Sequence, residues 1–109
     1  MRILFDHSTP APLRHALTTH VIVEAVERGW EMLENGALLD AAEAEGFEIF
    51  VTADKNIRYQ QNLAGRRLAI VVLKSSSNRL EHLRQYFPAI ALALEKIKSG
   101  EIVQVGSTN

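Results

Sequence analysis

The segments ILFDHS (residues 3–8) and IFVTADKN (residues 49–56) decide the fold of this chain. Each is an apolar, β-prone run that ends at an aspartate, Asp6 in the first and Asp54 in the second. Apolar residues that do not alternate with polar ones are typical of a parallel strand covered by helices on both faces. In a parallel sheet the carboxyl ends of all strands share one edge, and ligands bind there. We therefore predict that the two aspartates converge at this edge and form a site for a hard cation.

Strands alternate with helices along the rest of the chain. Strands are predicted over Arg2–Phe5, His20–Val23 (with an extension to Ala25 or Val26), Glu48–Thr52, Arg67–Leu73 and Ile102–Val105. Alternating strands and helices are joined by right-handed crossovers, which make the sheet parallel. We expect an α/β fold with three layers, α/β/α, around a mainly parallel sheet of about five strands.

Helices are predicted from apolar spacing and from residues that favour helix ends. They are one that begins around Pro10 and Pro12, one that carries Leu38, Leu39, Ala41 and Ala42 and ends near Gly46, one over Lys55–Leu63, and a long one from Asn78 or Arg79 to Ile97. Pro88 lies inside the longest helix and should kink or restart it. Turns are expected at Gly29 and at Asn35-Gly36.

The composition limits the classes of protein to which the chain can belong. Its 109 residues fit one domain, which we place at residues 1–106, with a frayed tail at 107–109. A net charge of −1 gives no overall nucleic-acid footprint, so such binding must come from a local basic patch. The lack of cysteine excludes disulfides, thiolate zinc sites and cysteine catalysis. No apolar stretch approaches the roughly 20 residues of a membrane span, so we expect a cytoplasmic protein with no membrane contact.

The candidate site residues also have ordinary structural interpretations. Asp6 and Asp54 can each cap the helix that follows, because aspartate is a favoured N-cap. Ser8 can contact a phosphate or a water on a metal, or it can simply cap. Thr52 can close the turn after its strand, or it can hydrogen-bond Asp54 or a ligand. The equivalent positions of the two aspartates at strand ends favour a functional site.

Polar and basic residues near the same edge are candidates for contacts with an anionic substrate. The segment that follows Asp54 can read phosphates or bases and stack Tyr59 on a base, or it can be a solvated helix face. A basic, hydroxyl-rich loop follows the strand at Arg67–Leu73 and favours an anionic ligand. The predicted substrate-binding residues are Ser8, Thr52, Lys55, Arg58, Tyr59, Gln60, Lys74 and Arg79.

Three segments, MRILFD, NGALLDAAEAEGFEIFVTADKN and RLAIVVL, resemble small bacterial PIN-like domains, relatives of the toxin ribonucleases of toxin–antitoxin pairs. The resemblance spans roughly residues 2 to 105, in order and with similar spacing. It implies a parallel α/β sheet with acidic residues gathered at the strand ends to hold Mg²⁺ or Mn²⁺. It also implies RNA as the substrate and an antitoxin protein as a partner. Asp6 matches the first acidic position of the family and Asp54 a later one. Separately, Leu80, Phe87 and Leu94 belong either to the core or to a dimer interface with a second copy of the chain.

The chain departs from the family pattern at two positions. Asn56 stands where the family often has a second aspartate, and Asn35 or Gly36 stands where the middle helix begins with an acidic residue. Either Glu34 or Asp40 can supply the missing carboxylate. We therefore expect one weak metal site formed by Asp6, Asp54, Asn56 and one of these two residues, with a second metal only when a phosphate adds its charge.

The function that follows is hydrolysis of RNA phosphodiesters by a divalent-metal-dependent ribonuclease, with Asp6 and Asp54 as the catalytic residues. A water on the metal would be the nucleophile, so no side-chain nucleophile is needed. The alternative is a non-catalytic PIN-like module that binds RNA or a partner protein through a degenerate metal site, and Asn56 favours it. A phospho-receiver is disfavoured because Asp6 stands alone after its strand. A nucleotide-binding protein is disfavoured because the chain has no glycine-rich phosphate loop.

Overall fold

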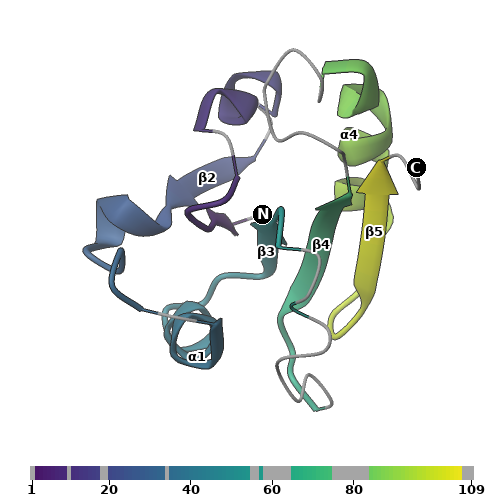
Figure 1. Ribbon diagram of the computed structural model, residues 1–109. Helices are drawn as coiled ribbons and strands as arrows, with labels where there is room; N and C mark the ends of the chain where they lie inside the picture. Colours follow the sequence, from purple (N-terminus) through teal and green to yellow (C-terminus); the bar gives the residue numbers. More distant parts are fainter. Residues whose placement is uncertain are drawn as a thin grey trace.

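Five parallel strands form a single sheet in the computed structural model of the protein, which describes residues 2–9, 11–17, 20–33, 35–54, 57, 65–74 and 84–106 (Figure 1). The strands are β1 (Arg2–Phe5), β2 (Val21–Glu24), β3 (Ile49–Thr52), β4 (Ala69–Lys74) and β5 (Ile102–Gly106). They lie side by side in the order β2-β1-β3-β4-β5, and each neighbouring pair is parallel. The predicted parallel α/β sheet is confirmed.

Successive residues of each strand enter two separate apolar layers. Ile3 and Phe5 of β1 pack on one face of the sheet with Ile90 and Leu94 of helix α4 (Phe87–Lys96). Leu4 packs on the other face, with side chains of helix α1 (Asn35–Ala44). All four residues of β3 are buried, as expected for a strand covered on both sides. The three-layer arrangement follows from these two cores.

Helix α1 ends where the sequence predicts. The N–H of Gly46 donates to the carbonyl of Glu43 at 3.1 Å, and the N–H of Phe47 donates to that of Ala42 at 3.0 Å. These two bonds form a Schellman motif, which needs a left-handed residue, and Gly46 has φ +81°. The predicted turn at Asn35-Gly36 is wrong, because both residues belong to the first turn of α1.

The second strand is shorter than its longest prediction. It ends at Glu24, and the 3-10 helix η2 (Ala25–Arg28) follows. The Glu24 side chain accepts the backbone N–H of Glu27, and the Glu27 side chain accepts that of Glu24, so a capping box begins the helix there. Gly29 closes η2 with φ +76°, which confirms the predicted turn.

The remaining helical segments agree with the sequence in part. The first is a 3-10 helix, η1 (Ala11–Ala16), rather than an α-helix. The longest predicted helix appears as the 3-10 helix η3 (Arg84–Tyr86) followed by α4, and Pro88 lies in the first turn of α4. A proline there loses no hydrogen bond, so the helix restarts at this point.

Several predicted features lie outside the described residues. They include the start of the longest helix, the tail at 107–109 and most of Lys55–Leu63, of which only Ile57 is described, as helical and fully buried. Within the described part of the chain, no helix is long and apolar enough to cross a membrane.

Candidate functional site

The two aspartates follow strands that are direct neighbours in the sheet. Strand β1 pairs with β3 in the register Ile3↔Ile49 to Phe5↔Val51, and Asp6 directly follows β1. Asp54 follows the end of β3 after Ala53. The chain runs from β1 to β2 on one side and then crosses to β3 on the other, so the strand order reverses between β1 and β3. The prediction that both aspartates follow adjacent parallel strands is confirmed, and they flank the point where open α/β sheets bind ligands.

The Asp6 carboxylate is surrounded by hydrogen-bond donors. Its Oδ1 atom accepts the backbone N–H groups of Ser8 at 3.1 Å and Thr9 at 3.2 Å. The hydroxyls of the same two residues lie 2.8 Å and 2.9 Å from Oδ1. The Oδ2 atom accepts the hydroxyl of Thr52 and lies 3.0 Å from that of Ser8. We call these three hydroxyl groups, from Ser8, Thr9 and Thr52, the hydroxyl clamp.

The hydroxyl clamp ties the loop after β1 to the end of β3. Thr52 is fully buried and Thr9 is 6% exposed, and they are the buried polar side chains of the described chain. The Thr52 hydroxyl accepts the backbone N–H of Asp54 at 3.0 Å while it donates to Asp6. The Ser8 hydroxyl accepts the N–H of Ala53 at 2.9 Å, and the Thr9 hydroxyl lies 2.9 Å from the carbonyl oxygen of Val51. The Thr52 hydroxyl therefore contacts both aspartates: it donates to the side chain of Asp6 and accepts from the backbone of Asp54.

These bonds exclude one interpretation of Asp6, that it caps the helix that follows. The aspartate does not cap η1, which begins only at Ala11. It instead accepts the N–H groups of the next residues in an Asx-turn that shapes the loop after β1. Thr9 was not among the predicted site residues, although three hydroxyl residues beside the two strand ends are a visible signal for such a network.

The hydrogen-bond donors around Asp6 leave only one of its carboxylate oxygens, Oδ2, able to bind a cation. An ionised carboxylate offers about four lone-pair positions. Two N–H groups and at least one hydroxyl fill those of Oδ1. Ser8 has a single hydroxyl hydrogen and is closer to Oδ1, so Thr52 is the main donor to Oδ2 among the described residues. Asp6 can therefore bind a metal ion through Oδ2 alone, and Asp54, which is half-buried, is the second carboxylate at this edge.

Asp40 is committed to a different contact. It lies on α1 and pairs at 2.8 Å with Arg66, which also bonds Glu43 at 2.6 Å. The hydrogen bonds that Arg66 donates to Glu43 and then to Asp40 raise the pKa of its guanidinium. Because Arg66 lies just before β4, this cluster belongs to the amino edge of the sheet, opposite to Asp6.

Most of the other predicted site residues cannot be placed. Glu34, Lys55, Asn56, Arg58, Tyr59, Gln60 and Arg79 lie outside the described residues. Lys74 is the last residue of β4 and so lies at the same edge as Asp6. In the ranges that the structure describes, no three histidine or acidic side chains gather as a metal-binding group.

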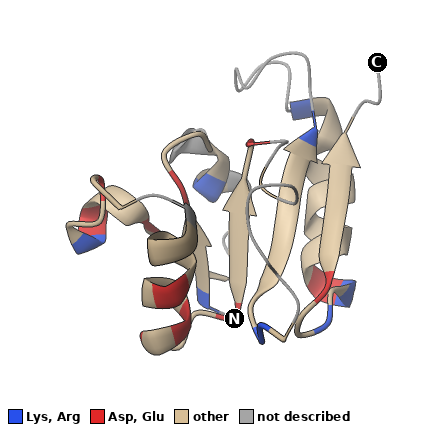
Figure 2. Cartoon of the chain, turned by 60° about the horizontal axis from the view of Figure 1, so that its bottom comes forward, with Lys and Arg blue, Asp and Glu red and all other residues tan. Residues whose placement is uncertain are grey.

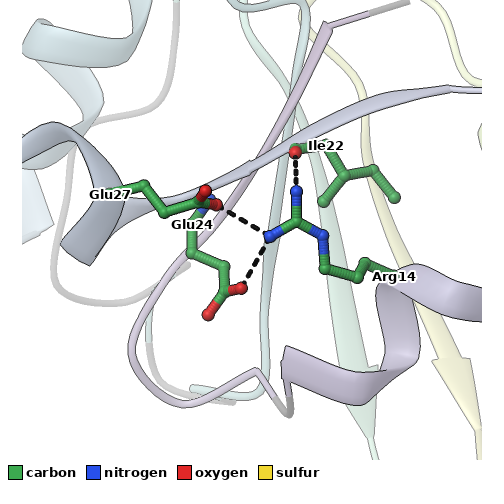
Figure 3. Close-up of polar contacts among 4 residues, drawn as sticks. All are labelled: Arg14, Ile22, Glu24 and Glu27. Carbon is green, nitrogen blue, oxygen red and sulfur yellow. Dashed lines mark hydrogen bonds and ion pairs between the residues drawn. The ribbon is translucent and has the colours of Figure 1, made fainter.

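Sequence analysis missed one acidic residue at this edge. Glu24 ends β2 and stands beside Phe5 in the sheet register. Its carboxylate faces Arg14, which contacts Glu24 and Glu27 at 2.8 Å each and donates to the Ile22 carbonyl at 2.6 Å (Figure 3). The hydrogen bond from the Glu24 backbone, followed by that from Arg14, lowers the pKa of Glu27. Arg14 thus forms an ion pair with Glu24 and donates a hydrogen bond to a backbone carbonyl of edge strand β2.

Charge and shape elsewhere do not indicate a second site. Lysine and arginine residues alternate with acidic residues along the described chain (Figure 2). A hollow of about 390 Å³ opens at the amino edge of the sheet, beside Phe47, Ile49 and Leu68. Its lining is mixed, with these apolar side chains beside the charged Glu43, Glu48 and Arg67.

Comparisons with known proteins leave the site to be argued from its own geometry. No family model, curated protein or solved structure matches the chain.

Proposed function

We propose that the sheet edge at β1 and β3 holds one divalent cation, Mg²⁺ or Mn²⁺, and hydrolyses RNA phosphodiesters. The observation that supports this most directly is the position of Asp6 and Asp54 after adjacent parallel strands, at the reversal of strand order. Oδ2 of Asp6 accepts the Thr52 hydroxyl and can offer its second lone pair to an ion, which suits a cation that needs only one or two carboxylates and retains waters.

Each residue of the proposed site would have a separate role. Asp6, through Oδ2, and Asp54 would hold the cation, while Thr52 keeps the two loops in register. Lys74, at the end of β4, would attract the phosphate. When bound, the cation supplies Lewis acidity and an activated water. As the first partner we propose RNA, and on the resemblance alone an antitoxin protein. We also propose a second copy of the chain as a partner, and a cytoplasmic location.

A second candidate is a non-catalytic module that binds RNA or a protein. It is favoured by the saturation of Asp6 Oδ1, which gives the carboxylate a structural role even without metal. Asn56 favours it as well, since an amide replaces a carboxylate at a position that the family often uses.

Thermal unfolding with and without Mn²⁺ separates these candidates. A Mn²⁺ concentration ten times the dissociation constant stabilises the folded protein by about 1.4 kcal/mol. We expect this stabilisation in the wild type and its loss in Asp54→Asn, which should still fold. The matched control is Asp40→Asn, because Asp40 is the remaining aspartate of the chain and is engaged at the opposite edge. It should keep the full Mn²⁺ response.

Cleavage of a single-stranded RNA is measured with the same variants. The wild type should cut the RNA with Mn²⁺ and stop in EDTA, and Asp54→Asn should be inactive. Asn56→Asp should raise both Mn²⁺ affinity and rate, where a tenfold gain in rate corresponds to about 1.4 kcal/mol. Mn²⁺ binding without cleavage would favour the non-catalytic module. If the wild type neither binds Mn²⁺ nor cleaves RNA, the metal site itself is contradicted.

A further inference from the structure

We infer that strand β5 pairs antiparallel with β5 of a second copy of the chain, so that two five-stranded sheets join into one. This inference rests on the proposal of a second copy as a partner and names the surface that receives it. That surface is not the one predicted from the sequence. Leu94 is buried in the core, Phe87 packs against the core, and Leu80 lies outside the described residues.

Strand β5 presents backbone hydrogen-bonding groups at its outer side. It is the end strand of the described sheet, with β4 as its neighbour (Figure 1). The N–H of Ile70 in β4 donates to the Glu101 carbonyl at 2.9 Å, in the register Ile70↔Ile102. Successive residues of a strand direct their N–H and C=O groups to opposite sides. Those of Val103 therefore point to β4, whereas those of Ile102 and Gln104 point away from the sheet, where no other described segment bonds to them.

The opposite edge of the sheet, at β2, is already protected. Arg14 donates to the Ile22 carbonyl at 2.6 Å, and Glu27 accepts the N–H of Glu24 at 2.8 Å. Natural edge strands commonly use side-chain cover, a lysine, a proline or a bulge to prevent pairing with another chain. Strand β5 reads IVQVG, with no charge and no proline, and its β-branched residues favour strand pairing. The contrast between the two edges indicates that β5 is the edge that receives a partner.

The sequence of β5 is complementary to itself in one register. An antiparallel pair centred on Gln104 places this side chain beside the partner's Gln104, and an amide can both donate and accept there. The same register places Val103 opposite the partner's Val105, on the face that α4 covers, and brings no like charges together. Val103 is only half-buried in one copy, so this apolar pair removes further surface from water.

A dimer of this kind is closed. Its twofold axis is perpendicular to the sheet, so the α4 helices of both copies lie on the same face and can extend the interface beyond the strands. The free edges of the joined sheet are then the two β2 strands, which Arg14 protects against the addition of further copies. Because the paired strands run in opposite directions, the Asp6 edges of the two copies lie at opposite ends, and each copy keeps its own candidate site.

The inference is tested by sedimentation velocity in EDTA, so that no metal contributes. The wild type is followed from about 1 μM to about 200 μM, because interfaces that bury less than about 1,200 Å² are mostly transient, and it should pass from monomer to dimer. Gln104→Pro removes an outward N–H and leaves the bonds between β4 and β5 in place. Its dimer dissociation constant should rise by at least about tenfold, because two main-chain bonds of the interface lose their donors.

A pair of charge variants tests the register. Gln104→Lys and Gln104→Glu each place like charges opposite one another at the twofold axis, so each alone should raise the dissociation constant by about fivefold. An equimolar mixture of the two should form a heterodimer with a dissociation constant at or below the wild-type value. These variants also keep the inference testable if circular dichroism shows that Gln104→Pro does not fold.

The matched control is Val21→Lys, which adds a charge at an exposed position of the other edge strand and should leave the dissociation constant unchanged. A wild type that stays monomeric, a dimer that the folded Gln104 variants leave intact, or one that Val21→Lys weakens equally overturns the inference. Each of these results leaves the proposed metal site standing. A dimer that only the Gln104 variants weaken, in a protein that does not bind Mn²⁺, supports the inference and contradicts the metal site alone.

Discussion

Replacing Asp6 by asparagine tests whether its carboxylate organises the loop after β1. Oδ1 accepts two backbone N–H groups and at least one hydroxyl. A hydrogen bond to a charged acceptor contributes about 1.5–3 kcal/mol, and a neutral one about 0.5–1.5 kcal/mol. Loss of the charge therefore costs about 1 kcal/mol for each bond, or about 3 kcal/mol for three. The neutral amide is less costly to bury in this half-buried position, so we expect a net loss of about 2 kcal/mol.

The loss is measured by urea unfolding in EDTA, so that no bound metal contributes. Trp30 is half-buried and packs edge-on against Phe47, with ring centroids 6.2 Å apart, which makes its fluorescence a suitable probe. The melting temperature should fall by about 6–12 °C. Asp40→Asn is the control, because the Asp40 side chain is 73% exposed and Arg66 keeps its second partner, so the cost should stay below about 0.5 kcal/mol. Equal stability of the two variants would refute the organising role of Asp6.

Two further predictions concern other parts of the fold. Gly106→Ala should lower the free energy of unfolding, measured in urea, by about 2–4 kcal/mol, because φ is +127° and a Cβ would lie 2.1 Å from the Lys74 carbonyl oxygen. The control Gly29→Ala, at φ +76° with open space around it, should lower it by only about 1 kcal/mol. Similar losses in the two variants would contradict the close approach at Gly106. The hydrogen bonds from the Glu24 backbone and then Arg14 lower the pKa of Glu27 below its ordinary 4.5, so its stabilisation is present above pH 4.5 and is lost as the pH falls through the folded value. Wild type should exceed Glu27→Gln in stability by less than about 1 kcal/mol at pH 7, and the difference should vanish in acid; a constant difference would exclude the carboxylate as its source.

The parallel sheet was predictable because its signals are local. The predicted and observed ends of all five strands agree to within two residues. Continuous apolar runs mark the central strands β1, β3 and β4, which are buried on both faces, whereas the edge strands β2 and β5 are partly exposed. Gly46 was predictable as a helix end because few other residues adopt the left-handed conformation. The turn expected at Asn35-Gly36 failed because packing of Leu38, Leu39 and Ala42 on the sheet outweighs the turn preference of that pair.

The sequence predicted which residues lie at the carboxyl edge of the sheet, but not the partners that their side chains contact. An apolar run that ends at an acidic residue identified Asp6 and Asp54, and the same pattern in VIVE (residues 21–24) would have identified Glu24. The side chain of Glu24 nevertheless turns to Arg14, a partner from another element that strand patterns do not reveal.

The role of each carboxylate thus depends on the donors that contact it. Arg14 neutralises Glu24, whereas Asp6 meets hydroxyls and N–H groups that orient it without adding a positive charge. A carboxylate oriented in this way retains its attraction for a cation, while an ion-paired one has lost most of it. Of these two carboxylates, Asp6 therefore suits the proposed metal site and Glu24 does not.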